Sequence, residues 1–86
     1  MGRDAMIVSE RQFNLVAAEY ALSPRQKQIM RLLLSGVDST EQIASRLRIR
    51  TGTVHIHFGR IYVKTHRASR AQLMYLFATE AKSATP

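Results

Sequence analysis

Residues 39–65 read STEQIASRLRIRTGTVHIHFGRIYVKT, and this stretch decides the fold of the chain. Ser39 and Gln42 form a capping box that opens a short helix. The segment 48–50 then forms a turn, and a second helix follows over 51–65. Apolar residues from both helices and the turn can close over one small core: Ile43, Leu47, Ile49 and Val54. This arrangement predicts a helix-turn-helix.

Capping signals predict further helices on both sides of this motif. A capping box at Ser9 opens a short amphipathic helix over 9–20, and another at Ser69 opens a last helix over 69–81. Between them, Pro24 stands at a first helical position and Gly36 at the end of a helix. No segment has the pattern of a strand. The sequence therefore predicts an all-α fold of about five helices.

Length and composition exclude several classes of protein. A chain of 86 residues is one small domain, and 45% hydrophobic residues suffice for a core. There is no cysteine, and the longest apolar run has six residues, against the roughly 20 that a membrane span needs. The N-terminus is charged, with no apolar segment typical of a signal peptide. A membrane protein, a disulfide-rich secreted protein and a two-domain enzyme are therefore not expected.

The positive charge is concentrated in one segment. The net charge is +7, and its excess lies in residues 46–70, which contain seven cations and no acidic residue. They are Arg46, Arg48, Arg50, Arg60, Lys64, Arg67 and Arg70. A solvated basic surface is the plain alternative, and an anionic membrane would require a cleaner apolar face than this segment has. The distribution favours a polyanionic partner.

The three histidines do not form a metal site. His55 and His57 are two residues apart, so on a helix they point about 200° away from each other. His66 lies beyond the helix end, and there is no cysteine. His57 is better explained as a packed structural residue. Since no nucleophile with a base, paired carboxylates or glycine-rich phosphate loop is present, we expect no enzyme activity, metal or cofactor.

Several motifs occur in a characteristic order between Leu22 and about Phe77. They are Leu22-Ser23-Pro24-Arg25, Leu32-Leu33, Gly36, Ile43-Ala44, Arg46-Leu47, Ile49, Thr53-Val54, His57, Ile61-Tyr62, Lys64 and Arg70-Ala71-Gln72-Leu73. In this order they resemble the LuxR-type (GerE-type) helix-turn-helix domain of bacterial transcription regulators. The expected organisation is an N-terminal extension with a short helix over 1–21, this domain over 22–81, and a frayed tail over 82–86.

The resemblance implies a four-helix DNA-binding domain, here with the additional N-terminal helix. The helix over 51–65 would be the recognition helix in the major groove, and His55, Ile56 and Gly59 match its base-contacting positions. Ile56 suits a thymine methyl and His55 can donate or accept at a base edge, whereas Gly59 has no side chain to read a base. The expected backbone contacts and basic face comprise Arg48, Arg50, Thr51, Thr53, Arg60, Lys64 and Arg67.

The chain departs from the family pattern at the ends of its helices. Arg48 stands in the turn where a glycine is usual, and Arg50 where a polar cap is usual, which leaves Thr51 as an alternative cap. The C-terminal glycine of the recognition helix is replaced by His66, which can adopt a left-handed conformation at some cost. One residue is added between Gly36 and Ile43. These changes leave the expected fold intact but prevent a transfer of sequence preference.

The last helix is apolar on two sides. Leu73, Leu76 and Phe77 can serve the core, while Met74, Tyr75 and Ala78 point toward another side that needs a partner. In relatives this helix is often the dimer contact. We therefore expect a homodimer through the last helix.

Two functions from different classes follow. The first is a sequence-specific transcription regulator that binds double-stranded DNA in the bacterial cytoplasm, at the nucleoid, with another regulator or RNA polymerase as further partners left open. The second is a protein-interaction module of the anti-activator type that keeps the fold and pairs with another regulator. Met1 and the capped first helix favour a stand-alone protein over a fragment of a longer one.

Overall fold

The computed structural model describes residues 6–83, with the side chains of residues 6–79. This part of the chain contains five helices and no strand, so the all-α prediction is confirmed. The helices are α1 (Glu10–Glu19), α2 (Pro24–Leu34), α3 (Thr40–Leu47), α4 (Thr51–Thr65) and α5 (Arg70–Ser83). Of the expected tail over 82–86, the first two residues continue α5, and 84–86 lie outside the described residues.

The N-termini of the first three helices have the predicted serine N-caps, but none of the three predicted capping boxes, at Ser9, Ser39 and Ser69, is complete. Ser23 has a complete capping box, in which its hydroxyl accepts from the Gln26 amide at 3.2 Å and its own amide donates to Gln26 Oε1 at 2.9 Å. At Ser39 and Ser69 only the serine half forms, and Gln72 Oε1 accepts from the Ala68 amide instead of the Ser69 amide. At Ser9, too, only the serine half forms. The expected return bond from Gln12 is wrong, because Gln12 Nε2 donates instead to the main-chain carbonyl of Phe77 at 2.6 Å.

The two ends of α4 lack the usual capping residues. Arg50, not Thr51, is the N-cap, so the alternative cap at Thr51 is wrong, and the Arg50 side chain makes no capping hydrogen bond. At the other end, His66 adopts the expected left-handed conformation with φ 57°. Arg48 does the same at the end of α3, with φ 58°. At both positions a residue with a Cβ atom adopts the left-handed conformation, which glycine would adopt without a steric cost.

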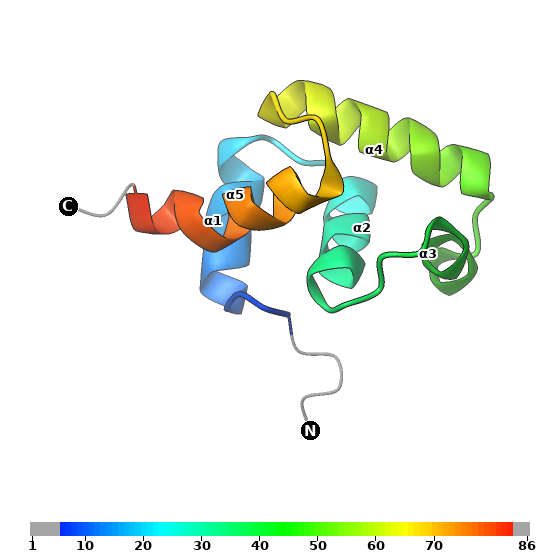
Figure 1. The fold of residues 1–86 in the computed structure, drawn as a ribbon, viewed down its shortest axis with the longest axis horizontal. Helices are drawn as coiled ribbons and strands as arrows, with labels where there is room; N and C mark the ends of the chain where they lie inside the picture. Colours follow the sequence, from blue (N-terminus) through cyan, green and yellow to red (C-terminus); the bar gives the residue numbers. More distant parts are fainter. Residues whose placement is uncertain (1–5, 84–86) are drawn as a thin grey trace.

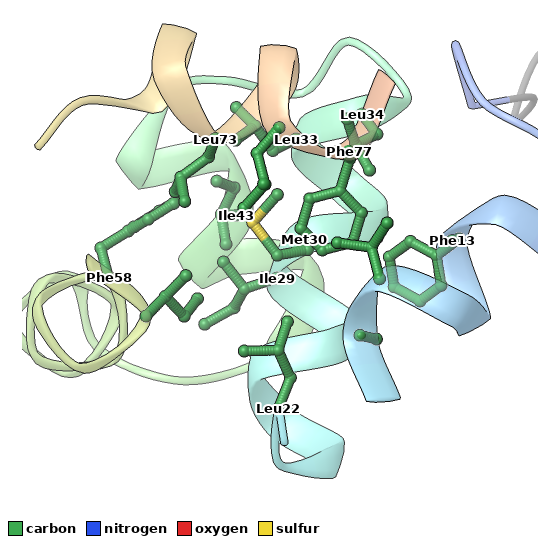
Figure 2. Close-up of a cluster of buried hydrophobic side chains, with 14 of the residues drawn as sticks. Phe13, Leu22, Ile29, Met30, Leu33, Leu34, Ile43, Phe58, Leu73 and Phe77 are labelled. Atoms are coloured by element: carbon green, nitrogen blue, oxygen red, sulfur yellow. The ribbon is translucent and has the colours of Figure 1, made fainter. Parts of the chain in front are cut away.

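The core joins two pairs of helices through α2 (Figure 1). On one side α1 packs against α5, with the Phe13 and Phe77 ring centroids 5.4 Å apart. On the other side α3 packs against α4, and both also contact α2. Figure 2 shows the central side chains, among which Ile29, Met30 and Leu33 of α2 are fully buried. The additional N-terminal helix is thus part of the core.

One side chain of α5 holds the connection between α2 and α3. Arg70 Nη1 donates to the main-chain carbonyl of Asp38, and Arg70 Nη2 donates to the Thr40 hydroxyl at 2.6 Å. The guanidinium also lies over the Phe58 ring, 4.2 Å from its centroid. Arg70 therefore links α5, the α2–α3 connection and α4.

Candidate nucleic-acid interface

The helix-turn-helix consists of α3, the turn at 48–50 and α4. Ile43 and Val54 are fully buried, and Leu47 and Ile49 pack against them partly buried, which confirms the predicted small core. The left-handed Arg48 reverses the chain direction, and the Ile49 amide then donates to the Ala44 carbonyl at 3.0 Å. These contacts fix the orientation of α4 relative to α3.

One face of α4 is buried and the opposite face is exposed. Val54, Phe58 and Ile61 lie in the core, and buried Thr65 donates its hydroxyl to the Ile61 carbonyl at 2.8 Å. The residues expected to contact bases, His55, Ile56 and Gly59, are all exposed. Positions one and four apart share one half of a helix circumference, so the three lie on one outer surface.

The cations of residues 46–70 fall into two groups. Arg46, Arg48, Arg50 and Arg60 are exposed, and no described residue forms a hydrogen bond or an ion pair with any of their guanidinium groups. No acidic residue occurs between Glu41 and Glu80. Of the two threonines expected at the DNA backbone, Thr51 is exposed and Thr53 half-buried. Uncompensated positive charge therefore lies at the end of α3, in the turn at 48–50 and at Arg60 of α4.

The second group of cations is used within the fold. Lys64 Nζ donates to the Ala21 carbonyl and to Gln26 Oε1, both at 2.8 Å. Arg67 Nη1 donates to the Thr65 carbonyl at 2.8 Å, and Arg70 holds the α2–α3 connection as described above. All three side chains are half-buried. Lys64 and Arg67, expected on the DNA-facing side, thus already have partners on their own chain.

His57 is half-buried on the flank of α4, as expected for a structural residue. Its Nδ1 atom is buried and has no hydrogen-bond partner. Burial lowers the pKa of this imidazole below the ordinary histidine value of 6.5, and the positive charges of Arg60 and Arg25 lower it further. The influence of Arg25 shows that α2 adds positive charge beside α4.

Two residues of this surface were missed by sequence reasoning. Arg25 stands in the part of the chain without excess charge, 32 positions before His57, and no pattern linked it to α4. Among the described residues, Val63 is the most exposed of the large hydrophobic side chains, at 75%. Val63 follows Ile56 by seven residues, or about two helical turns, and this spacing could have placed both side chains on one exposed face.

The expected dimer surface of α5 is only partly free. Leu73, Leu76 and Phe77 are buried as predicted, and α1 covers Phe77. Of the second side, Tyr75 is 71% exposed, while Met74 and Ala78 are half-buried. The uncovered part of α5 therefore centres on Tyr75.

Within residues 6–83, no group of three or more His, Asp or Glu side chains could hold a metal ion. The helices in this same range are also too short or too polar to cross a membrane.

The fold and the exposed outer face of α4 place the chain in the class of helix-turn-helix domains. A family model described as "Bacterial regulatory proteins, luxR family" matches residues 20–77. The chain therefore belongs to the luxR family of bacterial regulatory proteins, which confirms the resemblance in its motifs. Because this family comprises regulatory proteins, the matched domain is regulatory rather than enzymatic.

One curated relative comes from Aeromonas salmonicida and is named "Putative HTH-type transcriptional regulator in exeN 3'region". It is 46% identical over 56 residues, which cover 65% of this chain. The matched part spans only 28% of that relative. No solved structure matches the chain significantly.

Proposed function

We propose that the chain binds double-stranded DNA in a sequence-specific manner and regulates transcription, with α4 in the major groove. The observation that carries this proposal is the outer face of α4, where His55, Ile56 and Gly59 are exposed beside unpaired arginines. Membership of the luxR family and the name of the Aeromonas relative support it. The DNA would be in the bacterial cytoplasm, at the nucleoid.

The two groups of cations imply different contributions to DNA affinity. Arg48, Arg50 and Arg60 have all their donors available for phosphates, and Arg is suited to bidentate phosphate binding. An ammonium has three donors, of which Lys64 already uses two. Arg67 retains four of its five donors. We therefore assign the main phosphate contacts to the three exposed arginines, with Thr51 and Thr53 beside them and smaller contributions from Lys64 and Arg67.

The phosphate contacts can be tested by the salt dependence of binding. Each of Arg48→Ala, Arg50→Ala and Arg60→Ala should weaken binding to all duplexes and lower the slope of log affinity against log salt by about one. Fluorescence anisotropy with a labelled random-sequence duplex measures both. Arg11→Ala is the matched control, because Arg11 is exposed on α1, outside the proposed surface. Unchanged slopes for all three variants would remove this face from the interface.

Base reading is tested by comparing specific and random DNA. After a preferred site has been selected from random duplexes, His55→Ala and Ile56→Ala should each cost about 1–3 kcal/mol on that site and much less on random DNA. If both variants keep the wild-type ratio of specific to random affinity, α4 does not read the sequence.

We also propose a homodimer through the uncovered part of α5, formed by Met74, Tyr75 and Ala78. A two-fold axis there would place two recognition helices about 34 Å apart, or a multiple of this, along the DNA. Sedimentation velocity should show that Tyr75→Glu dissociates the dimer, while Gln28→Glu on the exposed side of α2 does not. A wild type that stays monomeric at all accessible concentrations would contradict this assembly.

The interaction-module hypothesis is the second candidate. The exposed apolar side chains on α4, Ile56 and Val63, favour it. It predicts that the protein binds no duplex at any salt concentration and instead captures another regulator. RNA polymerase is a further partner in the regulator hypothesis. The anisotropy titration described above separates the two functions.

A further inference from the structure

The centre of the exposed face of α4 carries no hydrogen-bonding side chain. Ile56 is 55% exposed and Val63 is 75% exposed, and Gly59 lies between them. Residues at positions i, i+3 and i+7 share one face of a helix, so the three form a single line along the outside of α4. No other part of the described chain covers the two apolar side chains.

A hollow in the surface accompanies this line. It is lined by Ile56, Gly59, Val63 and Arg60 of α4, together with Gln26 and Lys64. A Cβ atom placed on Gly59 would meet no atom within 4 Å, so the space above this residue is open. The hollow therefore has apolar walls, a floor of bare helix backbone and cationic groups at its edge.

The electrostatics of the edge indicate what could fill the hollow. Lys64 and Gln26 are hydrogen-bonded to each other, whereas the exposed Arg60 guanidinium has no partner among the described residues. With no acidic residue between Glu41 and Glu80, the surroundings attract an anion. The occupant should therefore present a small apolar group with a negative charge close to it.

A thymine nucleotide in the major groove has this chemistry. Thymine presents its C5-methyl group there, and the phosphates of the same strand border the groove. We propose that α4 reads thymine methyl groups through Ile56 and Val63, with Gly59 allowing a close approach and Arg60 binding an adjacent phosphate. This inference rests on the proposed DNA binding and adds Val63 as a specificity-determining residue.

The spacing of the two side chains makes the inference quantitative. Seven residues of α-helix span about 10.5 Å, and successive base pairs are about 3.4 Å apart. If the axis of α4 runs parallel to the DNA axis, Ile56 and Val63 contact base pairs about three steps apart. The preferred half-site should therefore contain two thymines at that separation, on either strand.

Uracil substitution tests this directly, because uracil differs from thymine only by the missing methyl group. The full chain is titrated with its selected duplex, in which each thymine is replaced by uracil in turn. Affinity should fall about fourfold at two positions about three base pairs apart, which corresponds to about 0.8 kcal/mol for each buried methyl. Substitution at other positions should have little effect.

Variants identify which side chain contacts which methyl. Ile56→Ala should remove the uracil sensitivity at one position and Val63→Ala at the other, both with an unchanged salt slope. Leu15→Ala is the matched control, since Leu15 on α1 is exposed to the same 55% as Ile56. This variant should keep both sensitivities.

The possible failures are distinguishable. Specific DNA binding with no sensitivity to uracil, or sensitivity that survives both variants, overturns the inference but leaves the proposed function. Absence of binding to any duplex overturns the proposed function as well. Self-association that is lost in Val63→Asp but not in Tyr75→Glu would show that a protein surface covers this face, and this result would also overturn the inference.

Discussion

Helices α4 and α5 both carry apolar side chains around much of their circumference, and the chain covers more of them on α5 than on α4, although Tyr75 of α5 stays exposed. On α5, the ring of Phe77 is fully buried because α1 places Phe13 against it. On α4, Ile56 and Val63 are left exposed. The difference shows that an apolar residue on a helix does not by itself identify an intermolecular surface, because another helix of the same chain can bury it.

The two regions also differ in whether their polar and charged side chains have partners within the chain. Gln12 of α1 donates to the Phe77 carbonyl, and Glu10 pairs with Arg31 at 2.6 Å, so these two polar side chains of α1 have internal partners. Beside the outer face of α4, the guanidinium of Arg60 has none among the described residues. We infer that the α1–α5 pair contributes mainly to stability and the α3–α4 pair mainly to binding.

The largest change in stability is expected from a substitution where α1 covers α5. Phe13→Ala removes a fully buried ring and should lower the free energy of unfolding by about 3–5 kcal/mol, as is usual for buried aromatic residues. Leu15→Ala on the same helix is exposed and should change it by less than about 0.5 kcal/mol. Urea denaturation followed by circular dichroism measures both. Equal, small effects would show that α1 is not part of the stable fold.

A smaller loss of stability should distinguish a cation that is used within the fold, Lys64, from an exposed one, Arg60. Lys64→Ala removes hydrogen bonds to Ala21 and to buried Gln26. Hydrogen bonds to charged groups contribute about 1.5–3 kcal/mol, and this side chain is partly solvated. The substitution should therefore lower the free energy of unfolding by about 1–2 kcal/mol. Arg60→Ala should leave stability within about 0.5 kcal/mol of the wild type. Urea denaturation of both variants tests this, and the reverse order would contradict the division between structural and DNA-binding cations.

The end of α4 should permit a stabilising substitution. His66→Gly relieves a left-handed conformation that a side-chain residue adopts at a cost, and should raise the free energy of unfolding by about 0.5–1 kcal/mol. His55→Gly is the control of opposite sign, because glycine inside a helix costs about 1 kcal/mol relative to alanine. Thermal unfolding of the two variants compares them, and a destabilised His66→Gly would show that the imidazole makes a compensating contact.

The last prediction concerns the direction of a pH dependence. Because the pKa of His57 is lower in the folded protein than the ordinary histidine value of 6.5, the unfolded chain binds more protons at acidic pH. His57 should therefore reduce stability as the pH falls through 6.5 toward its folded pKa, and the reduction should stay constant below that. Urea midpoints at pH 7.5 and pH 5 should differ less for His57→Gln than for the wild type. An identical difference would show that His57 is not responsible.

Much of the fold could be predicted because its signals are local. Ser23, Pro24 and Gly36 bracket α2 as expected, and the left-handed conformation of His66 followed from its place beyond α4. The exposure of His55 and Ile56 followed from the buried position of Val54 one residue earlier. In each case neighbouring residues determine the outcome.

The partners of the polar side chains could not be predicted, since they depend on tertiary structure. From the sequence, Lys64 is expected to be available for a phosphate. In the structure its ammonium donates to two acceptors of the same chain, 43 and 38 positions away, and one of them is a main-chain carbonyl. Gln12 has the position of a capping residue but bonds to a carbonyl 65 positions away. Main-chain carbonyls occur at every residue, so no sequence pattern marks the one that a side chain will reach.

The hydrogen bonds from Arg70 to the α2–α3 connection affect how this domain tolerates insertions. Arg70 bonds to Asp38 and Thr40 on both sides of the α3 N-cap, so the start of α3 is fixed from outside the connection. The entropic cost of a longer loop grows only slowly with its length. Residues added between Gly36 and Asp38 can therefore bulge into solvent while α3 and α4 keep their positions, and this segment is where the domain can best accept a length change or an inserted tag.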